Sequence, residues 1–219
     1  MRRIAWLLLL VSFSFGQRPL VRYFVQANGG FSAPWGDFDG RKQLNSVPDS
    51  IIIAETVNLH KISPYPMVEL RLGANIDASA VAISLFLGSA STKYNGAEQE
   101  DKSSLQGLNF LYQYNWSFSP VEPMFGVGYG FTRLGVPQAA KWEDEGESLR
   151  DKVLFSGAGP IITGGLNFPV NKHIHLGFDN RISLFWASHL TTTANDYSKL
   201  DRDLWQWSFN SSLAVKIIF

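Results

Sequence analysis

The sequence contains no cysteine and carries no net charge. The absence of cysteine excludes a disulfide framework and thiolate chemistry, so burial and backbone pairing alone must hold the chain together. The 19 basic residues balance 19 acidic residues, and loss of residues 1–16 would leave 17 basic against 19 acidic. This balance argues against a nucleic-acid-binding protein, which normally has a basic stripe.

Long apolar runs are absent after residue 16, and the one run before it predicts a secretory signal. Arg2 and Arg3 precede an uncharged apolar stretch over residues 4–15, which is too short for a membrane-spanning helix of about 20 residues. Ser14 and Gly16 are small residues placed for cleavage after position 16. A retained membrane anchor is the alternative interpretation.

Aromatic residues are abundant, with 16 Phe, 7 Trp and 7 Tyr, yet the mean hydropathy is only −0.03. Apolar residues alternate with polar or very small ones, which places one class on each face of a strand. Most of the alternating segments are near the length of about 9–11 residues that a tilted transmembrane strand requires. There are eight of them: 21–31, 67–76, 80–89, 107–116, 122–132, 155–168, 173–186 and 204–219.

The connections between these segments also alternate, here in length. Long connections are expected at 32–66, 90–106, 133–154 and 187–203, and tight turns at 77–79, 117–121 and 169–172. Outer-membrane barrels have short turns at the periplasmic rim and long loops outside. An even strand number places both termini at the periplasmic rim. Residues 51–53 and 57–59, within the first long connection, are candidates for additional strand.

These patterns predict an all-β fold, an eight-stranded antiparallel up-and-down transmembrane β-barrel. A sheet that spans hydrocarbon must close, because every backbone N–H and C=O has to be paired. A soluble lipocalin-type barrel also has eight strands, with its apolar residues inside. Large rings at strand ends, glycines on the inward faces and a terminal Phe219 favour the membrane barrel.

The last segment resembles the C-terminal signal of outer-membrane barrels, which the barrel-insertion machinery reads, through Leu213, Val215, Ile217 and Phe219. The whole layout is similar to the eight-stranded family that includes OmpX, the OmpA membrane domain and Opa- and NspA-type proteins. We expect a signal peptide over 1–16 and a barrel over 17–219, and the resemblance implies a place in the outer membrane of a Gram-negative bacterium after periplasmic transit. Aromatic residues expected at the membrane interfaces are Trp116, Trp186, Trp205, Trp207 and Phe219.

Ionisable residues on the predicted inward faces are candidates for a charge network in the lumen. A charge in a narrow interior is costly unless it is paired. One interpretation is structural; the other is a gate in which Glu69 or Asp179 changes its pairing with Arg71 or Arg181. The candidates are Arg22, Glu69, Arg71, Glu122, His175, Asp179, Arg181 and Lys216.

Ser188 and His189, with Thr191 and Asp203 beyond them, suggest an enzymatic alternative. Some eight-stranded barrels are lipid A acyl hydrolases with a His, a nearby Ser and an acidic residue near the outer rim. Here the hydroxyl two residues after His189 is a threonine, and the asparagine-rich flanking pattern of that family is missing. A polar loop is the simpler interpretation.

Other motifs are weak. The glycines at 126, 128 and 130 lack the strand-to-helix context of a phosphate loop, and we expect them to make room for a bulky neighbour such as Phe86 or Phe24. The acidic stretch at 143–147 lacks calcium-loop spacing. No cofactor is expected, and no metal-ligand pattern joins His60, His173, His175 and His189.

The sequence therefore predicts a structural or surface-interacting outer-membrane protein, because function in this group is carried by the loops. Expected partners are outer-membrane lipids and lipopolysaccharide, the insertion machinery and an extracellular ligand at the loops, with no nucleic acid. A narrow porin-like gated pore is the second hypothesis and a lipid A acyl hydrolase the third.

Overall fold

The computed structural model describes residues 20–38, 40–47, 53–59, 61–94, 97–118, 120–136, 153–191 and 198–219. The predicted signal peptide, His60 and the acidic stretch at 143–147 lie outside this range. All regular secondary structure in the described residues is β-strand. Within that same range no helix is long and apolar enough to cross a membrane.

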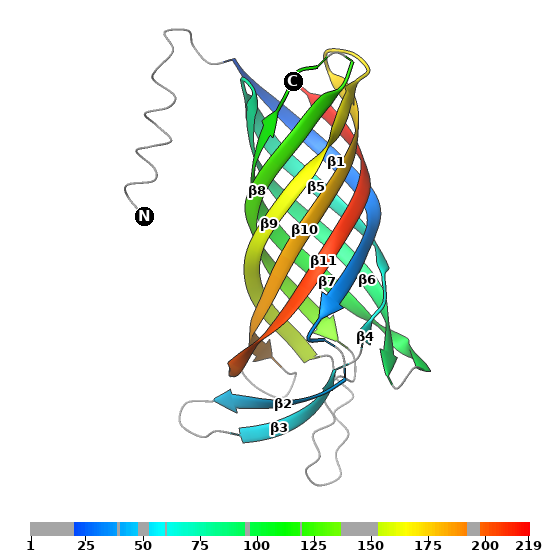
Figure 1. Cartoon of the computed structure of the whole chain (residues 1–219), viewed down its shortest axis with the longest axis vertical. Helices are drawn as coiled ribbons and strands as arrows, with labels where there is room; N and C mark the ends of the chain where they lie inside the picture. Colours follow the sequence, from blue (N-terminus) through cyan, green and yellow to red (C-terminus); the bar gives the residue numbers. More distant parts are fainter. Residues whose placement is uncertain are drawn as a thin grey trace, which may run out of the picture.

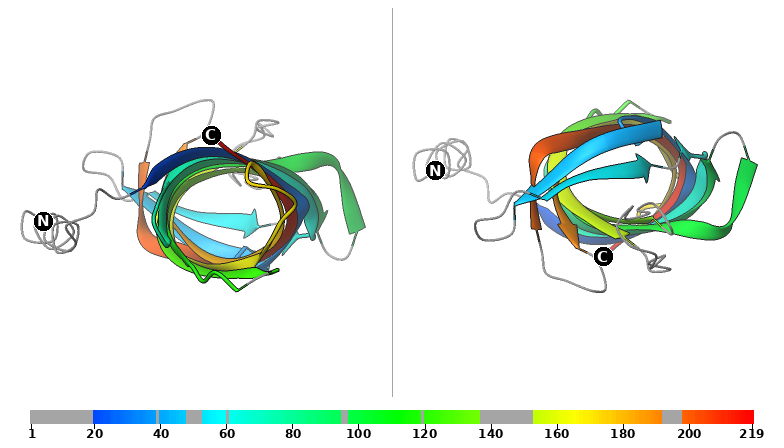
Figure 2. Two further views of the ribbon diagram at one scale, coloured as in Figure 1. Left: turned by 90° about the horizontal axis from the view of Figure 1, so that it is seen from above. Right: turned by 90° about the horizontal axis from the view of Figure 1, so that it is seen from below.

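Eight long strands form a closed antiparallel barrel, as the alternation predicts (Figures 1 and 2). Their order around the barrel follows the sequence, and the first and last strands pair from Phe24–Ile218 to Gly36–Gln206, which closes the sheet. Closure leaves no open edge in the wall, so its backbone groups are paired. The strands are β1 (Val21–Gly36), β5 (Tyr65–Ile76), β6 (Ser79–Tyr94), β7 (Ala97–Asn115), β8 (Glu122–Val136), β9 (Val153–Pro169), β10 (Ile174–Thr191) and β11 (Ser198–Ile218).

The two ends of the barrel differ in their connections. The tight turns that join β5 to β6, β7 to β8 and β9 to β10 lie at the end where the C-terminus is found (Figure 1). Asp77, in the first of these turns, has a positive φ of 53°, and its carboxylate accepts a hydrogen bond from the Leu20 amide. The opposite end carries the long connections. The predicted alternation of short and long connections is therefore correct.

The predicted strand ends are wrong at the long-connection end. Both strands around the predicted loop at 90–106 continue into it, with Tyr94 opposite Ala97 at the tip of the hairpin. Strands β10 and β11 similarly continue to Thr191 and from Ser198. The reason is that backbone pairing in these extensions does not depend on the apolar alternation that a lipid-facing strand needs.

The first long connection contains three additional strands, β2 (Gly40–Val47), β3 (Ile53–Leu59) and the two-residue β4 (Lys61–Ile62). In the hairpin of β2 and β3, β2 pairs with the start of β11 at Lys199 and Leu200. The hairpin lies across one end of the barrel (Figure 2). β3 matches the strand expected at 57–59 and at residue 53, whereas residues 51 and 52 lie outside the described residues. β2 carries no clear apolar alternation and was not predicted.

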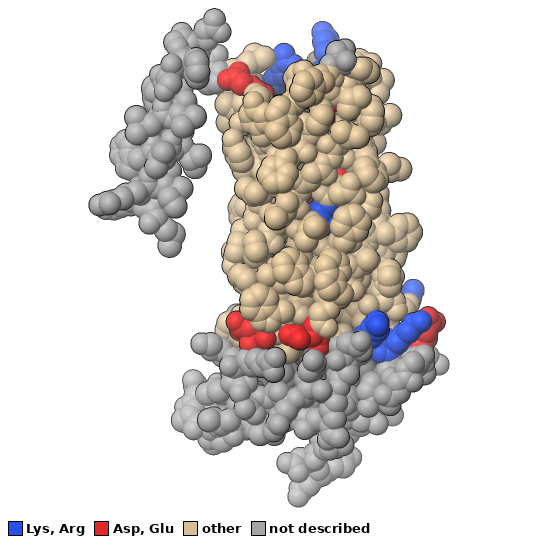
Figure 3. Space-filling model, viewed as in Figure 1, with Lys and Arg blue, Asp and Glu red and all other residues tan. Residues whose placement is uncertain are grey.

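The barrel wall is apolar outside and polar inside. On β11, Trp205 and Leu213 are 44% and 72% exposed, and Phe219 just after it is 70% exposed, whereas the intervening polar residues, such as Gln206 and Lys216, are buried. Figure 3 shows the charged residues gathered at the two ends, with a broad uncharged band between them broken only by small spots of colour. This arrangement confirms the predicted faces of the last strand.

Candidate functional site: the charge cluster in the barrel lumen

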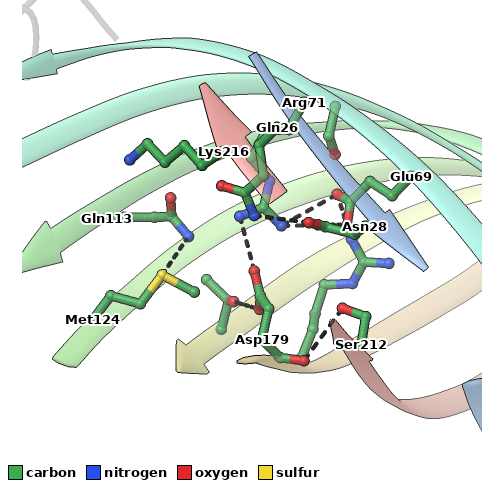
Figure 4. Close-up of polar contacts among 12 residues, drawn as sticks. Gln26, Asn28, Glu69, Arg71, Gln113, Met124, Asp179, Ser212 and Lys216 are labelled. Atoms are coloured by element: carbon green, nitrogen blue, oxygen red, sulfur yellow. Dashed lines mark hydrogen bonds and ion pairs between the residues drawn. The ribbon is translucent and has the colours of Figure 1, made fainter. Parts of the chain in front are cut away.

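Four buried charged residues meet across the lumen, and Figure 4 labels three of them, Glu69, Arg71 and Asp179. Two come from β5, Glu69 and Arg71, and two from β10, Asp179 and Arg181; these strands are not neighbours in the wall. Arg71 Nη1 lies 2.9 Å from Asp179 Oδ2, and Arg181 Nη1 lies 3.0 Å from Glu69 Oε1. Arg71 Nη2 also lies 3.3 Å from Glu69 Oε2. This quartet has two positive and two negative charges, so it is neutral as a unit.

Neutral polar side chains hold the carboxylates of the quartet in place. Asn28 donates to Glu69 at 2.8 Å, and Gln26 donates to Asn28 at 2.8 Å. On the other side of the lumen, the Thr163 hydroxyl donates to Asp179 at 2.8 Å. Each buried carboxylate therefore has both a cationic and a neutral donor, which offsets part of the cost of removing its charge from water.

The other predicted lumen charges do not join the quartet. Lys216 donates to Asn75 Oδ1 at 3.1 Å, and its amine lies 4.1 Å from the centre of the Phe24 ring. His175 Nδ1 lies 3.4 Å from Glu122 Oε2 nearer the short-turn end. Arg22 is exposed at the start of β1. The structure thus divides the predicted network into a central quartet, two smaller contacts and one rim residue.

An apolar plug fills the lumen on the long-connection side of the quartet. Phe38, just after β1, packs edge-on against Phe155 at 5.0 Å and is stacked near Phe185 at 6.1 Å between ring centres. The neighbouring Asp37 fixes this position, since its amide donates to the Trp205 carbonyl and its carboxylate accepts from the Trp205 amide at 3.0 Å. The buried members of the plug are Phe38, Ile62, Tyr65, Met67, Ala90, Leu105, Leu134, Val136, Phe155, Phe185, Ala187 and Leu204.

Sequence reasoning missed this plug. Several of its members lie in segments expected to be loops, where no periodicity marks an inward face. A cavity of about 30 Å³ remains between quartet and plug, bordered in part by Arg181 and Asn109. That is room for only a few water molecules. The lumen at this level is therefore filled mostly by side chains.

A second apolar cluster lies toward the short-turn end, formed by Phe24, Ala80, Ala82, Leu111, Ile161 and Ile218. The rings of Phe24 and Phe86 fit only because Gly73 and Gly107 lack side chains there. Glycines 126, 128 and 130 do make room for neighbouring side chains, but Phe24 and Phe86 are not those neighbours. A Cβ at those positions would instead meet Gln113, Leu111 and Asn109.

The predicted interface aromatics lie on the outer face near the two ends of the barrel. Trp186 and Trp205 are partners in the β10–β11 ladder and pack edge-on at 5.0 Å. Trp207 lies opposite Trp35, which is 50% exposed and was missed because it follows the predicted end of the first strand. At the other end, the predicted residues are Trp116, packed on Tyr114 at 5.1 Å, and Phe219, 70% exposed.

Ser188 and His189 lie on the outer face where β10 has an irregularity in its pairing between Ala187 and His189. The Ser188 Oγ and His189 Nδ1 atoms are 2.8 Å apart. Thr191 is the last residue of β10, and Asp203 is exposed on β11. Among the residues that the structure describes, no group of three His, Cys, Asp or Glu side chains could hold a metal ion.

Comparison with known proteins supports the fold. No protein-family model and no curated protein matches the sequence. Among solved structures, the chain is similar to Neisserial surface protein A, with a TM-score of 0.55 and 12% identity over 90% of this chain and 97% of that one. It is also similar to a major outer membrane protein from Thermus thermophilus, with a TM-score of 0.50 and 13% identity over 91% of this chain and 99% of that one.

Both similarities cover nearly the whole of each chain, and at this level of identity they bear on fold alone. The chain therefore has the fold of eight-stranded outer-membrane barrels. This confirms the resemblance that the strand pattern and the last strand suggested.

Proposed function

We propose that this chain is an outer-membrane protein whose closed barrel displays a surface for molecular contacts at its long-connection end. Location in the membrane is supported by the band of exposed apolar side chains around the whole barrel, because so large an apolar surface would be unstable in water. In this proposal the signal peptide at 1–16 is removed, and the short-turn end faces the periplasm.

A filled lumen is the observation that carries a structural or surface role in preference to a pore. The neutral quartet crosses the centre, the apolar plug lies on one side of it, and the Phe24 cluster lies on the other. An ion that entered this path would lose its hydration and find no net charge to compensate it. The quartet therefore serves to brace β5 against β10.

Planar-bilayer recording tests this proposal against the pore hypothesis. We expect the refolded wild-type protein to insert without conductance steps, since the plug, the quartet and the Phe24 cluster occupy the lumen among the described residues. A conducting porin, refolded and inserted under the same conditions, controls for the sensitivity of the method. Reproducible conductance of the wild-type barrel that is altered by Arg71→Met would overturn the closed-lumen proposal and favour a gate.

Lipid A acyl hydrolysis is a second candidate function, and the contact between Ser188 and His189 favours it. A histidine beside a serine hydroxyl can accept its proton during attack on an ester. The test is mass spectrometry of lipid A incubated with the protein and with a Ser188→Ala variant. Loss of an acyl chain that depends on Ser188 would support hydrolysis, and unchanged lipid A with both proteins would reject it.

A further inference from the structure

A groove of about 650 Å³ lies on the outer face of the barrel, over β6 to β10. It lies apart from the lumen site, on the surface that the proposed function gives to lipid. The described residues along it come from five consecutive strands, and two rows of outward side chains account for most of them. These rows differ in polarity, and the difference indicates what the groove can bind.

The lower row, nearer the short-turn end, is apolar. Leu85 pairs with Leu108, Leu108 with Phe131, and Phe131 with Ala158, so these side chains lie next to one another across four strands. Ala158 is small and lies between the rings of Phe131 and Trp186, its partners on the two neighbouring strands. The floor of the groove is therefore low here, and it offers a strip of apolar surface for a hydrocarbon chain.

The upper row begins with the apolar Leu87 on β6, which pairs with Gln106, and is polar and cationic from β7 to β10. Gln106 pairs with Arg133, Arg133 with Ser156, and Ser156 with His189. These residues are the next outward positions along their strands, further from the short-turn end than the lower row. Arg133 is exposed, and among the residues that the structure describes it has no carboxylate partner and no acidic side chain lines the groove. Ser188 orients the His189 ring through the 2.8 Å contact. An unpaired guanidinium between hydroxyl and amide side chains is suited to bind a phosphate.

We propose that this groove binds a phosphate-bearing acyl lipid, with the phosphate on Arg133, Ser156 and Gln106 and an acyl chain along the lower row. The two rows match the two parts of such a lipid in order and in charge. Their height also fits, because the Trp186–Trp205 pair on the same face marks an interface between hydrocarbon and water. The inference rests on the proposed location in a membrane and adds a defined lipid site to it.

Native mass spectrometry of the full-length protein refolded in detergent tests the site. Three probes are compared: phosphatidic acid, diacylglycerol with the same chains, and inorganic phosphate. We expect phosphatidic acid alone to remain bound to the wild-type barrel. Arg133→Gln should weaken its binding about tenfold, because one charge-assisted contact to the phosphate is lost. Ala158→Trp should weaken it by filling the chain strip without changing charge.

Lys172→Gln is the matched control, because Lys172 is an exposed cation in a turn at the opposite end. Its binding of phosphatidic acid should equal that of the wild type. Heat-modifiable gel migration shows whether each variant forms the folded barrel. A variant that folds but does not bind lipid bears on the lipid site alone and leaves the proposed function intact. Equal binding by wild type and Arg133→Gln, or equal binding of diacylglycerol and phosphatidic acid, would overturn the proposal.

Discussion

The inner and outer faces of the barrel wall are built from the same strands but have opposite requirements for polar side chains. In the middle of β5, Glu69 and Arg71 point inward and are nearly inaccessible, whereas Leu70 between them is 47% exposed. The inner face must pair each polar group that it removes from water, and the outer face must present few polar groups within the band that meets lipid. Neighbouring residues of one strand therefore tolerate different substitutions. Removing a charge from the inner face and adding one to the outer face should both lower the stability of the barrel.

Breaking the quartet should give the largest effect. Arg71→Met leaves the carboxylates of Glu69 and Asp179 with one cation between them, and we expect the free energy of unfolding to fall by about 3–5 kcal/mol. The double variant Arg71→Met/Asp179→Asn restores neutrality, since Glu69 keeps Arg181. It should be more stable than the sum of the single variants predicts. Urea unfolding in lipid vesicles, followed by tryptophan fluorescence, measures both.

A matched control is Arg22→Met. It removes an arginine that was also predicted on the inward face of its strand, but at the exposed rim. Its stability should remain close to that of the wild type. If it loses as much stability as Arg71→Met, or if the double variant is simply additive, the quartet is not the bracing unit described above.

Placing a charge on the outer face should lower the free energy of unfolding slightly less than breaking the quartet does. Leu70→Arg puts a guanidinium near the middle of the apolar band, where we expect a loss of about 2–4 kcal/mol in vesicles. The same substitution at Val170, an exposed residue in the last short turn, should cost little. The same urea titration reports both. Equal costs at these two positions would show that the outer face does not contact hydrocarbon.

The smallest effect is expected in the apolar plug. Phe155→Leu keeps the site apolar but removes the edge-on contact with Phe38, and aromatic pairs of this kind contribute about 1 kcal/mol. Stability should fall by that amount, and the fluorescence of Trp205, whose backbone bonds Asp37, should change with it. A loss as large as that of Arg71→Met would mean that the plug, and not the quartet, dominates the inner face.

The strand number, the wall topology and the faces of β11 could be predicted because one physical rule controls them. A spanning strand must alternate where it meets lipid, and Trp205 through Phe219 follow that rule at every outward position except Ser211. The inward placement of Glu69, Arg71, Asp179 and Arg181 follows from the same alternation. Their grouping into one quartet does not, because it depends on which strands face each other across the closed barrel.

Beyond the lipid-facing band the rule no longer applies, and prediction failed there. Strands β6 and β7 continue to Tyr94 and from Ala97 through polar residues, held by backbone pairing that leaves no periodic signal. Phe38 lies outside any strand, and its inward position depends on the hydrogen bonds between Asp37 and Trp205. The polar row of the outer groove is likewise a product of register, since Gln106, Arg133 and Ser156 are far apart in sequence.

The most direct test is of the central claim that the barrel wall is apolar outside and polar inside. It is made possible by the absence of cysteine from the sequence. Single cysteines placed from position 212 to 217 of β11 can carry spin labels, and their collision with oxygen and with a water-soluble nickel complex can be measured in lipid vesicles. We predict high oxygen accessibility at Leu213, Val215 and Ile217, and low accessibility at Ser212, Ala214 and Lys216. A uniform profile, or one in which the outward positions meet the nickel complex, would contradict the membrane barrel.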